Sequence, residues 1–162
     1  MSKDQTIALI ETLKEKGLTL ALAESCTGGI TGALITEIPD VSACYMGGII
    51  AYRNEVKIKL LKVTEETLKQ YGAVSSKTAQ EMAIGVKDAL GSDIGASITG
   101  IAGPGGGTED KPIGTVYIAI TDGKRDVSMK LPLEHDKEQT RNTIRNDSAK
   151  MLIEAIRNFI RE

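Results

Sequence analysis

The sequence predicts an α/β fold, a three-layer α/β/α sandwich around a mixed β-sheet, in one domain of residues 1–162. The first observation behind this is that helical and extended apolar patterns alternate along most of the chain. The second is a hairpin signal, Asp122-Gly123, between two apolar runs, which adds antiparallel pairing to the sheet. The third is the length of 162 residues, which suits one domain with a sizeable core.

The first part of the chain alternates between helical and extended patterns. Apolar residues at Ile7, Ile10 and Leu13 recur at helical spacing up to Gly17. The apolar run that follows has the length of a buried strand, and an amphipathic stretch resumes at Ile30. The expected elements are a helix ending at Gly17, a strand over 18–23, a helix over about 29–37 that Pro39-Asp40 breaks, a strand over 45–52 and one or two helical turns over 55–61.

The second part of the chain carries clearer helix starts and a hairpin. Thr64 is a predicted N-cap, with acidic residues in the turn that follows, and Ser75-Ser76 opens a longer helix to about Leu90. The apolar face of that helix comprises Ala79, Met82, Ala83 and Val86. The remaining expected elements are a strand over 94–99, a glycine-rich loop over 100–112, strands over 114–121 and 127–133, and an amphipathic helix over about 137–161.

Composition and charge narrow the possible functions. A formal charge of −2 gives no electrostatic footprint for nucleic acid. No apolar run approaches the roughly 18 residues that a membrane helix needs, and the amphipathic start lacks a secretory signal pattern. Cys26 and Cys44, the two cysteines, give no disulfide framework, so a cytoplasmic location is expected.

The junction after the first strand, ESCTGG at Glu24 to Gly29, is the first candidate site. Ser25 has two interpretations there. It is either a helix N-cap, which accepts a free amide hydrogen, or a nucleophile at a helix N-terminus, where free amides favour an oxyanion. From this stretch alone, the N-cap is the favoured interpretation.

A second candidate group is Tyr52 with Lys57, which follow the second expected strand. Both could face one cleft, since Tyr52 ends the strand and Lys57 lies in the next turn of helix. A lysine beside a serine hydroxyl acts as a general base only if its surroundings lower its pKa toward neutrality. Without other evidence, a solvated surface lysine is the more common case.

The third and fourth candidates are a loop and a pair of arginines. The loop from Thr99 to Thr108 (TGIAGPGGGT) has five glycines, which let backbone amides approach a phosphate or carboxylate, although flexible glycine loops are common. It matches neither a Walker pattern nor a dinucleotide fingerprint. Arg141 and Arg145 share a helical face and either clamp a phosphate or balance Glu134 and Glu138 at the surface. A serine triad or a zinc site would need the only histidine, His135, and has little support.

Together these motifs resemble the CinA C-terminal domain family, which includes stand-alone nicotinamide-nucleotide amidohydrolases, also called NMN deamidases. The resemblance rests on ESCTGG at 24–29, GGIIAYRNEVKIKLL at 47–61 and TGIAGPGGGTEDKPIGTVYIA at 99–119, in family order. It runs over about residues 5–160. It implies a three-layer α/β/α fold and hydrolysis of the carboxamide of nicotinamide mononucleotide to nicotinic acid mononucleotide and ammonia.

The resemblance also implies roles for particular residues, with no metal or cofactor. Ser25 would be the nucleophile and neutral Lys57 its general base, while Tyr52 would relay the proton or hold Lys57 in place. Amides around Thr27, Gly28 and Gly29 would stabilise the oxyanion. The ribose phosphate would be held by Thr99, Gly100, Gly103, Gly105, Gly106 and Arg141.

One departure from the family pattern concerns the segment before the last helix. The family carries a Phe-x-Gly-Asp-Arg-like pattern there, whereas this chain has Lys137 in place of the Arg and lacks the Phe and Gly; Asp136 and Arg141 match. The alternative hypothesis is therefore a catalytically inactive nucleotide-binding module. A competence-related or nucleic-acid partner is a third, which the net charge disfavours. The apolar faces of the terminal helices predict a homo-oligomer.

Overall fold

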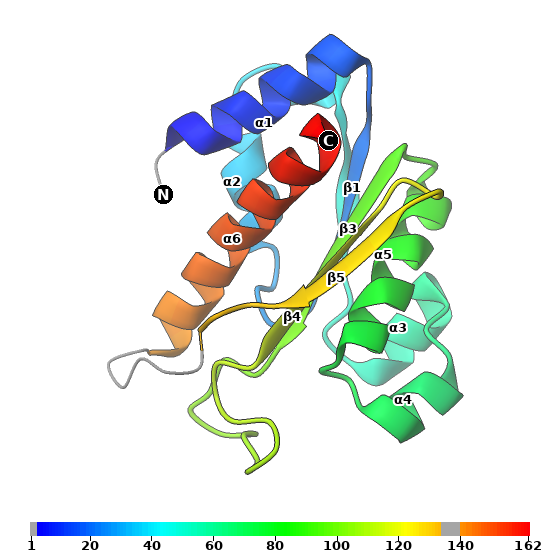
Figure 1. The fold of residues 1–162 in the computed structure, drawn as a ribbon, viewed down its shortest axis with the longest axis vertical. Helices are drawn as coiled ribbons and strands as arrows, with labels where there is room; N and C mark the ends of the chain where they lie inside the picture. The colour runs from blue at the N-terminus through cyan, green and yellow to red at the C-terminus, as the bar shows by residue number, and fades with distance from the viewer. Residues whose placement is uncertain (1–2, 134–139) are drawn as a thin grey trace.

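The computed structural model describes residues 3–133 and 140–162, which form one sheet with helices on both of its sides (Figure 1). The strands are β1 (Leu20–Glu24), β2 (Tyr45–Ile50), β3 (Ile94–Gly100), β4 (Val116–Thr121) and β5 (Asp126–Lys130). The helices are α1 (Lys3–Lys16), α2 (Ile30–Thr36), α3 (Asn54–Leu61), α4 (Glu65–Tyr71), α5 (Ser76–Leu90) and α6 (Arg141–Arg161), with a 3₁₀ turn at Val41–Ala43.

The sheet is mixed, with the strand order β2-β1-β3-β4-β5. β1 runs parallel to both β2 and β3, and Ala23 lies opposite Ile49 on one side and Ser97 on the other. β3, β4 and β5 pair antiparallel, and the β4–β5 hairpin turns at Gly123, whose φ is 85°. Because β1, β2 and β3 are parallel, the segments that follow them all emerge at the same edge of the sheet.

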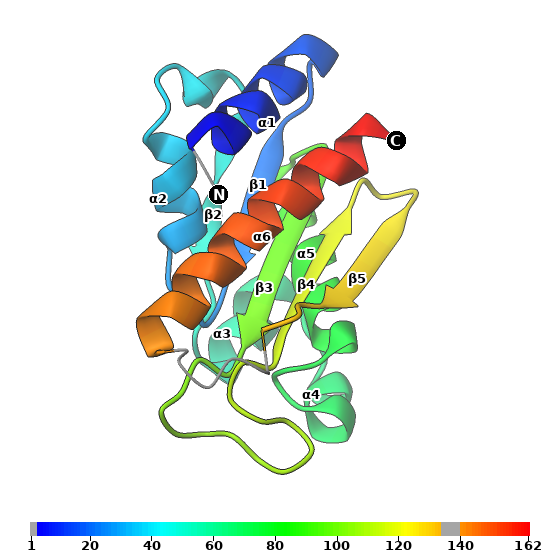
Figure 2. The ribbon, with the colours of Figure 1, turned by 60° about the vertical axis from the view of Figure 1, so that its left-hand side comes forward.

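Helices α1, α2 and α6 cover one face of the sheet, and α3, α4 and α5 cover the other (Figures 1 and 2). This confirms the predicted α/β/α sandwich. The side chains of β1 alternate between the two sides: Leu20 and Leu22 belong to the core under α1 and α6, and Ala21 and Ala23 to the core under α5. The small residues allow α5 to approach closely, since a Cβ at Gly95 would lie 2.2 Å from the carbonyl oxygen of Ala83.

The predicted helix starts at Thr64 and Ser75 are confirmed. The Thr64 side chain accepts a hydrogen bond from the amide of Thr67, and Ser75 accepts one from Thr78. β4 begins at Val116 rather than at Gly114, because the amide of Thr115 donates to Pro112 and closes the preceding loop. The expected helix start near Lys137 lies outside the described residues, and the described helix begins at Arg141, where Thr140 is its N-cap.

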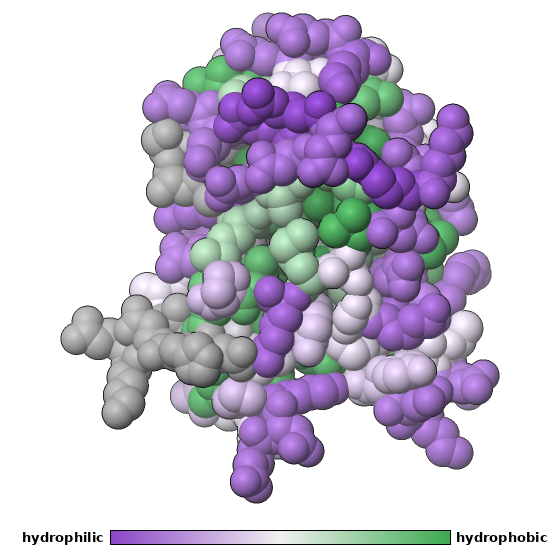
Figure 3. Space-filling view, viewed as in Figure 1, coloured by the Kyte–Doolittle hydropathy of each residue, from purple (hydrophilic) through white to green (hydrophobic). Residues whose placement is uncertain are grey.

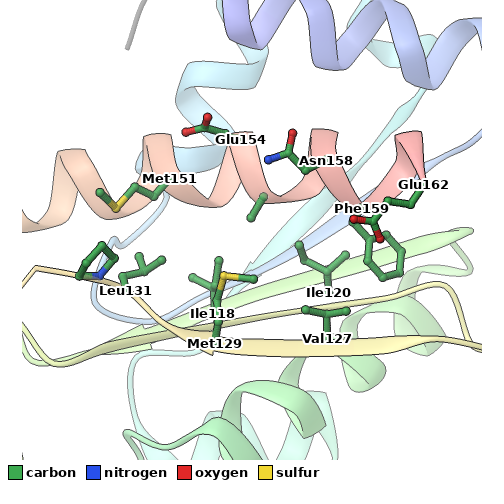
Figure 4. Close-up of a pocket in the computed structure, with 12 residues that line it drawn as sticks. Ile118, Ile120, Val127, Met129, Leu131, Met151, Glu154, Asn158, Phe159 and Glu162 are labelled. Carbon is green, nitrogen blue, oxygen red and sulfur yellow. The ribbon is translucent and has the colours of Figure 1, made fainter.

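An apolar groove remains open between α6 and the outer strands, because α6 crosses the sheet diagonally and leaves β5 uncovered (Figure 2). It appears as a band of apolar side chains in Figure 3 and has a volume of about 340 Å³. Phe159 points from α6 toward Ile120 and Val127 of the sheet (Figure 4). No predicted site residue lines this groove, and nothing in the described chain occupies it. The homo-oligomer stays a prediction.

None of the helices in the described part of the chain combines the length and the apolar character needed to cross a membrane.

Candidate active site

Ser25 directly follows β1 at the edge of the sheet where the parallel strands end. Its amide donates to the carbonyl of Ile98 in β3 at 3.0 Å, so the sheet ladder itself positions the residue. The residue is buried, with only 7% of its surface exposed. The N-cap of α2 is Gly29, which has a φ of 104° and, as a glycine, no side chain to cap the helix. The N-cap interpretation of Ser25 is therefore wrong, and its hydroxyl instead accepts a hydrogen bond from Lys57.

Glu24, and not Ser25, caps the N-terminus of α2. Its buried carboxylate accepts hydrogen bonds from the amides of Gly29, Thr31 and Gly32 at 3.2, 3.1 and 2.8 Å, and from the Thr27 hydroxyl at 2.6 Å. A buried carboxylate is tolerated when its oxygens are saturated with donors, and the N-terminus of a helix favours its charge. The signal that was missed is an acidic residue at the end of an otherwise apolar strand, directly before a helix.

Lys57 is buried, with 1% of its surface exposed, and it is not the surface lysine that spacing alone favoured. Its Nζ lies 3.1 Å from the Ser25 Oγ, 2.7 Å from the Ala51 carbonyl oxygen and 3.3 Å from that of Tyr52. Burial lowers the pKa of Lys57 from 10.5 to about 8. Ser25 and Lys57, which are 32 residues apart in sequence, thus form a buried pair.

The geometry of the pair suits either protonation state of the amine. As an ammonium group, Lys57 donates one hydrogen to each of its three acceptors. As a neutral amine, it keeps two hydrogens for the carbonyls of Ala51 and Tyr52, and its lone pair faces the Ser25 hydroxyl. The two carbonyls therefore orient the lone pair toward the proton that a general base would remove.

The side chain of Tyr52 makes no hydrogen bond to this pair within the described part of the chain. It is 58% exposed, and its hydroxyl accepts a hydrogen bond from Arg141 at 3.1 Å. Among the described residues, the hydrogen bond between Tyr52 and Lys57 uses the backbone carbonyl of Tyr52. Tyr52 therefore holds Lys57 through its main chain, while its phenol is bonded to the first residue of α6.

The glycine loop reaches the same edge through Arg141. The guanidinium of Arg141 donates to the Gly103 carbonyl at 2.6 Å, so it joins the loop to Tyr52. Gly105 has no atom within 4 Å of where a Cβ would be, and Gly106 has a φ of 85°, so both suit an open loop that a ligand could approach.

Two other residues expected to bind substrate have structural partners. The Thr99 hydroxyl is buried and donates to the carbonyl of Ala73 at 2.8 Å. Gly100 is needed for close packing, because a Cβ there would lie 2.6 Å from a methyl carbon of Val116. These residues shape the base of the loop, and the structure shows Thr99 bonded within the fold.

The turn after Ser25 uses some of the amides expected to stabilise an oxyanion. The Gly28 amide donates to the Ser25 carbonyl at 3.1 Å, and the Gly29 amide donates to Glu24. Within the described residues, the amide of Thr27 donates to no acceptor. The Arg145 guanidinium donates to the carbonyls of Cys26 and Thr27, each at 3.0 Å, so it is not free. Glu134 and Glu138, which could balance it at the surface, lie outside the described residues.

Cys26 is the only thiol in this turn, and it is buried. Burial raises its pKa to about 11, so it remains protonated at neutral pH and does not compete with Ser25 as a nucleophile. Among residues 3–133 and 140–162, no three His, Cys, Asp or Glu side chains are grouped as metal ligands. His135, considered for a triad or a zinc site, lies outside the described residues.

Comparison with known proteins identifies relatives of this chain. The family model described as the CinA C-terminal domain matches residues 3–160. A CinA-like protein of Synechocystis is 58% identical over 121 residues, which are 74% of this chain and 29% of that protein. A CinA-like protein of Thermotoga maritima is 44% identical over 153 residues, which are 94% of this chain and 36% of that protein. The chain thus spans about a third of the length of these curated relatives.

Solved structures show the same fold. A competence/damage-inducible protein from Agrobacterium tumefaciens superposes with a TM-score of 0.92 at 32% identity, over 99% of this chain and 95% of that one. A competence damage-inducible protein A from Klebsiella pneumoniae superposes with a TM-score of 0.92 at 29% identity, over 99% and 97% of the two chains.

Proposed function

The chain belongs to the family of CinA C-terminal domains, and from that premise we propose that it hydrolyses the carboxamide of nicotinamide mononucleotide to nicotinic acid mononucleotide and ammonia. One observation carries the proposal: the buried Lys57 lies 3.1 Å from the Ser25 hydroxyl and has a pKa lowered to about 8. A lysine so placed is a general base for a serine nucleophile.

Acylation begins when neutral Lys57 accepts the Ser25 proton and Oγ attacks the carboxamide carbon. The carbonyl oxygen becomes an oxyanion, which amide donors of the turn stabilise. Collapse of this intermediate breaks the C–N bond, and the Lys57 ammonium gives its proton to the leaving nitrogen, which departs as ammonia. An ester between Ser25 and the nicotinoyl group remains.

Deacylation repeats these steps with water. Lys57, neutral again, accepts a proton from a water molecule whose oxygen attacks the ester carbon. Cleavage of the ester returns the proton from Lys57 to the Ser25 Oγ and releases the carboxylic acid, which ionises. Lys57 acts as base and then as acid in each half of the reaction, which a pKa near neutrality permits.

The nucleotide would be held by the glycine loop and Arg141. Arg141 is exposed at the edge of the sheet and donates to Gly103 and to the hydroxyl of Tyr52, whose carbonyl accepts from Lys57. A guanidinium group pairs with phosphate through parallel hydrogen bonds. The phosphate of the substrate would compete with the Gly103 carbonyl and the Tyr52 hydroxyl for the N–H groups of Arg141.

Ammonia release from nicotinamide mononucleotide tests the proposal. We expect turnover by the wild type, with and without a metal chelator, and a loss of about 10⁴-fold or more in Ser25→Ala. A matched control is Ser76→Ala, since Ser76 is an exposed serine at the start of α5 whose hydroxyl is hydrogen-bonded to that of Ser128. A folded wild type that releases no ammonia at saturating substrate would disprove this activity.

The second candidate is a nucleotide-binding module without catalysis. Lys137, in place of the family arginine, and the missing Phe and Gly of that segment favour it; residues 134–139 lie outside the described part of the chain. Calorimetric binding of nicotinamide mononucleotide without ammonia release would identify this function.

A further inference from the structure

Arg145 crosses from the second turn of α6 to the turn that carries Ser25. Its Nε donates to the carbonyl of Cys26 and its Nη2 donates to the carbonyl of Thr27, both at 3.0 Å. The contacts join residues 119 and 118 positions apart in the sequence. One rigid guanidinium therefore holds two successive peptide groups directly after the nucleophile.

Holding a carbonyl also fixes the amide on the other side of the same peptide group. In a trans peptide the C=O of one residue and the N–H of the next point in opposite directions. With its carbonyl held by Arg145, the peptide between Cys26 and Thr27 directs the Thr27 N–H away from Arg145. The peptide between Thr27 and Gly28 has the same arrangement. Its carbonyl accepts from Arg145, and its N–H, that of Gly28, donates to the Ser25 carbonyl.

The turn is held from its other side by Glu24. The Glu24 carboxylate accepts hydrogen bonds from the Thr27 hydroxyl and the Gly29 amide, so the side chain and the end of the turn are fixed independently of Arg145. The Thr27 amide, two residues after Ser25, has no acceptor among the described residues. A fixed, unused donor beside a nucleophile is what an oxyanion requires.

The charge of Arg145 strengthens this donor. A hydrogen bond from a guanidinium to a carbonyl is charge-assisted and polarises the peptide group that accepts it. The polarised peptide between Cys26 and Thr27 places more positive charge on the Thr27 N–H.

We propose that Arg145 is a positioning residue: it aims and polarises the Thr27 amide as an oxyanion donor, and it is not a ligand of the substrate phosphate. This inference rests on the proposed function and deepens it. It separates two arginines that spacing alone grouped as a phosphate clamp. Arg141 is exposed at the rim, whereas Arg145 is half-buried, and its two hydrogen bonds within residues 3–133 and 140–162 are made to the turn.

Steady-state kinetics with two substrates tests the proposal. Nicotinamide mononucleotide carries the phosphate, and nicotinamide riboside lacks it. For Arg145→Met we expect kcat to fall about tenfold to a hundredfold with both substrates while KM changes less than about threefold, because a misaligned donor weakens only the transition state. Arg145→Lys should recover part of kcat, since an ammonium group can still hold one carbonyl. Arg161→Met, at the exposed far end of α6, is the control and should match the wild type.

The opposite pattern would overturn the inference. A rise in KM for the mononucleotide alone, with kcat and the riboside kinetics unchanged, would make Arg145 a phosphate ligand. Wild-type kinetics in folded Arg145→Met would show that Arg145 has no role in positioning the Thr27 amide or in binding the phosphate. If Arg145→Met does not fold, Arg145→Lys decides by the same comparison of kcat with KM.

A readout that does not need turnover separates this inference from the proposed function. A fluorophosphonate forms a bond from the Ser25 Oγ to phosphorus and releases fluoride, and its phosphoryl oxygen requires the same donor. If the wild type does not hydrolyse the nucleotide but Ser25 is labelled, labelling slowed about tenfold or more in Arg145→Met supports the positioning role, and equal labelling overturns it. A wild-type Ser25 that neither turns over substrate nor becomes labelled overturns both proposals.

Discussion

At Lys57, burial and hydrogen bonding act on the amine in opposite directions. Removal from water favours the neutral form, whereas three oxygen acceptors favour the ammonium. No carboxylate is among its hydrogen-bond partners in the described chain. The effect of burial is the larger, so the pKa of Lys57 is lowered to about 8. The amine can therefore lose and regain a proton near neutral pH.

The pH dependence of kcat/KM should report this group. Because Lys57 must be neutral to act as a base, we expect kcat/KM to rise about tenfold per pH unit below pH 8 and to level off above it. In Lys57→Arg the guanidinium keeps its proton, so this variant should be inactive over the whole range. A flat wild-type profile between pH 6 and 9, or an active Lys57→Arg, would contradict the assignment of Lys57 as the base.

At the scale of elements, the short helix α2 depends on a residue outside it. The N-cap residue, Gly29, has no side chain that could cap the helix. Glu24, at the end of the preceding strand, instead accepts hydrogen bonds from the amides at the start of the helix. The same carboxylate therefore ends β1, starts α2 and fixes the turn in which Ser25 lies. Stability and the placement of the nucleophile are coupled through this one group.

The substitution Glu24→Gln should expose this coupling. In glutamine an NH₂ group replaces one of the two carboxylate oxygens that accept hydrogen bonds from the backbone amides, so hydrogens face hydrogens there. The negative charge at the helix N-terminus is also lost. We expect the free energy of unfolding to fall by about 1–3 kcal/mol in urea denaturation, with reduced ammonia release. Glu11→Gln, on the exposed side of α1, is the control and should change neither. A Glu24→Gln variant as stable as the wild type would show that the cap is dispensable.

Helix α5 lies close to α3 because Gly85 has no side chain. A Cβ at Gly85 would lie 1.9 Å from the carbonyl oxygen of Leu61, so Gly85→Ala must push α3 and α5 apart. We expect a loss of about 2 kcal/mol or more in the free energy of unfolding, despite the higher helix propensity of alanine. Gly105→Ala, in open space, should change it by less than about 0.5 kcal/mol. Equal stability of the two variants in urea denaturation would refute the close-packing argument.

At the scale of the whole molecule, four distant segments meet at one edge of the sheet. The parallel strands β1 and β2 bring Ser25 and Lys57 together, and β3 leads into the glycine loop. Helix α6 then brings Arg141 and Arg145 to the same edge from the end of the chain. Arg141 contacts the segments after β2 and β3, and Arg145 contacts the turn after β1. Helix α6 therefore connects the three segments across the site.

Substitution of Arg141 should separate binding from chemistry. We expect Arg141→Ala to raise KM for nicotinamide mononucleotide about tenfold or more, with kcat within a few-fold of the wild type, since a phosphate contact is equal in the ground and transition states. KM for nicotinamide riboside should not change, and Arg141→Lys should recover part of the affinity. A fall in kcat with an unchanged KM would instead place Arg141 in the chemical step.

Much of the architecture could be predicted because the signals are local. The period of the apolar residues distinguished strands from helices, and the hydroxyl side chains of Thr64 and Ser75 marked helix starts that the structure confirms. Family motifs then indicated Ser25 and Lys57 as a pair. Local signals failed where a cap came from outside the helix, as with Glu24, because no pattern within α2 records it.

The sequence by itself determined the order of the elements, the sandwich and the residue types available at the candidate site. Only the tertiary structure decided what those residues do there. Lys57 is a base candidate because β2 and α3 bury it against Ser25, and Arg145 differs from Arg141 because of which carbonyls each can reach. The physical reason is that propensity and periodicity act over a few residues, whereas burial, and with it pKa and hydrogen-bond direction, is set by segments distant in the chain.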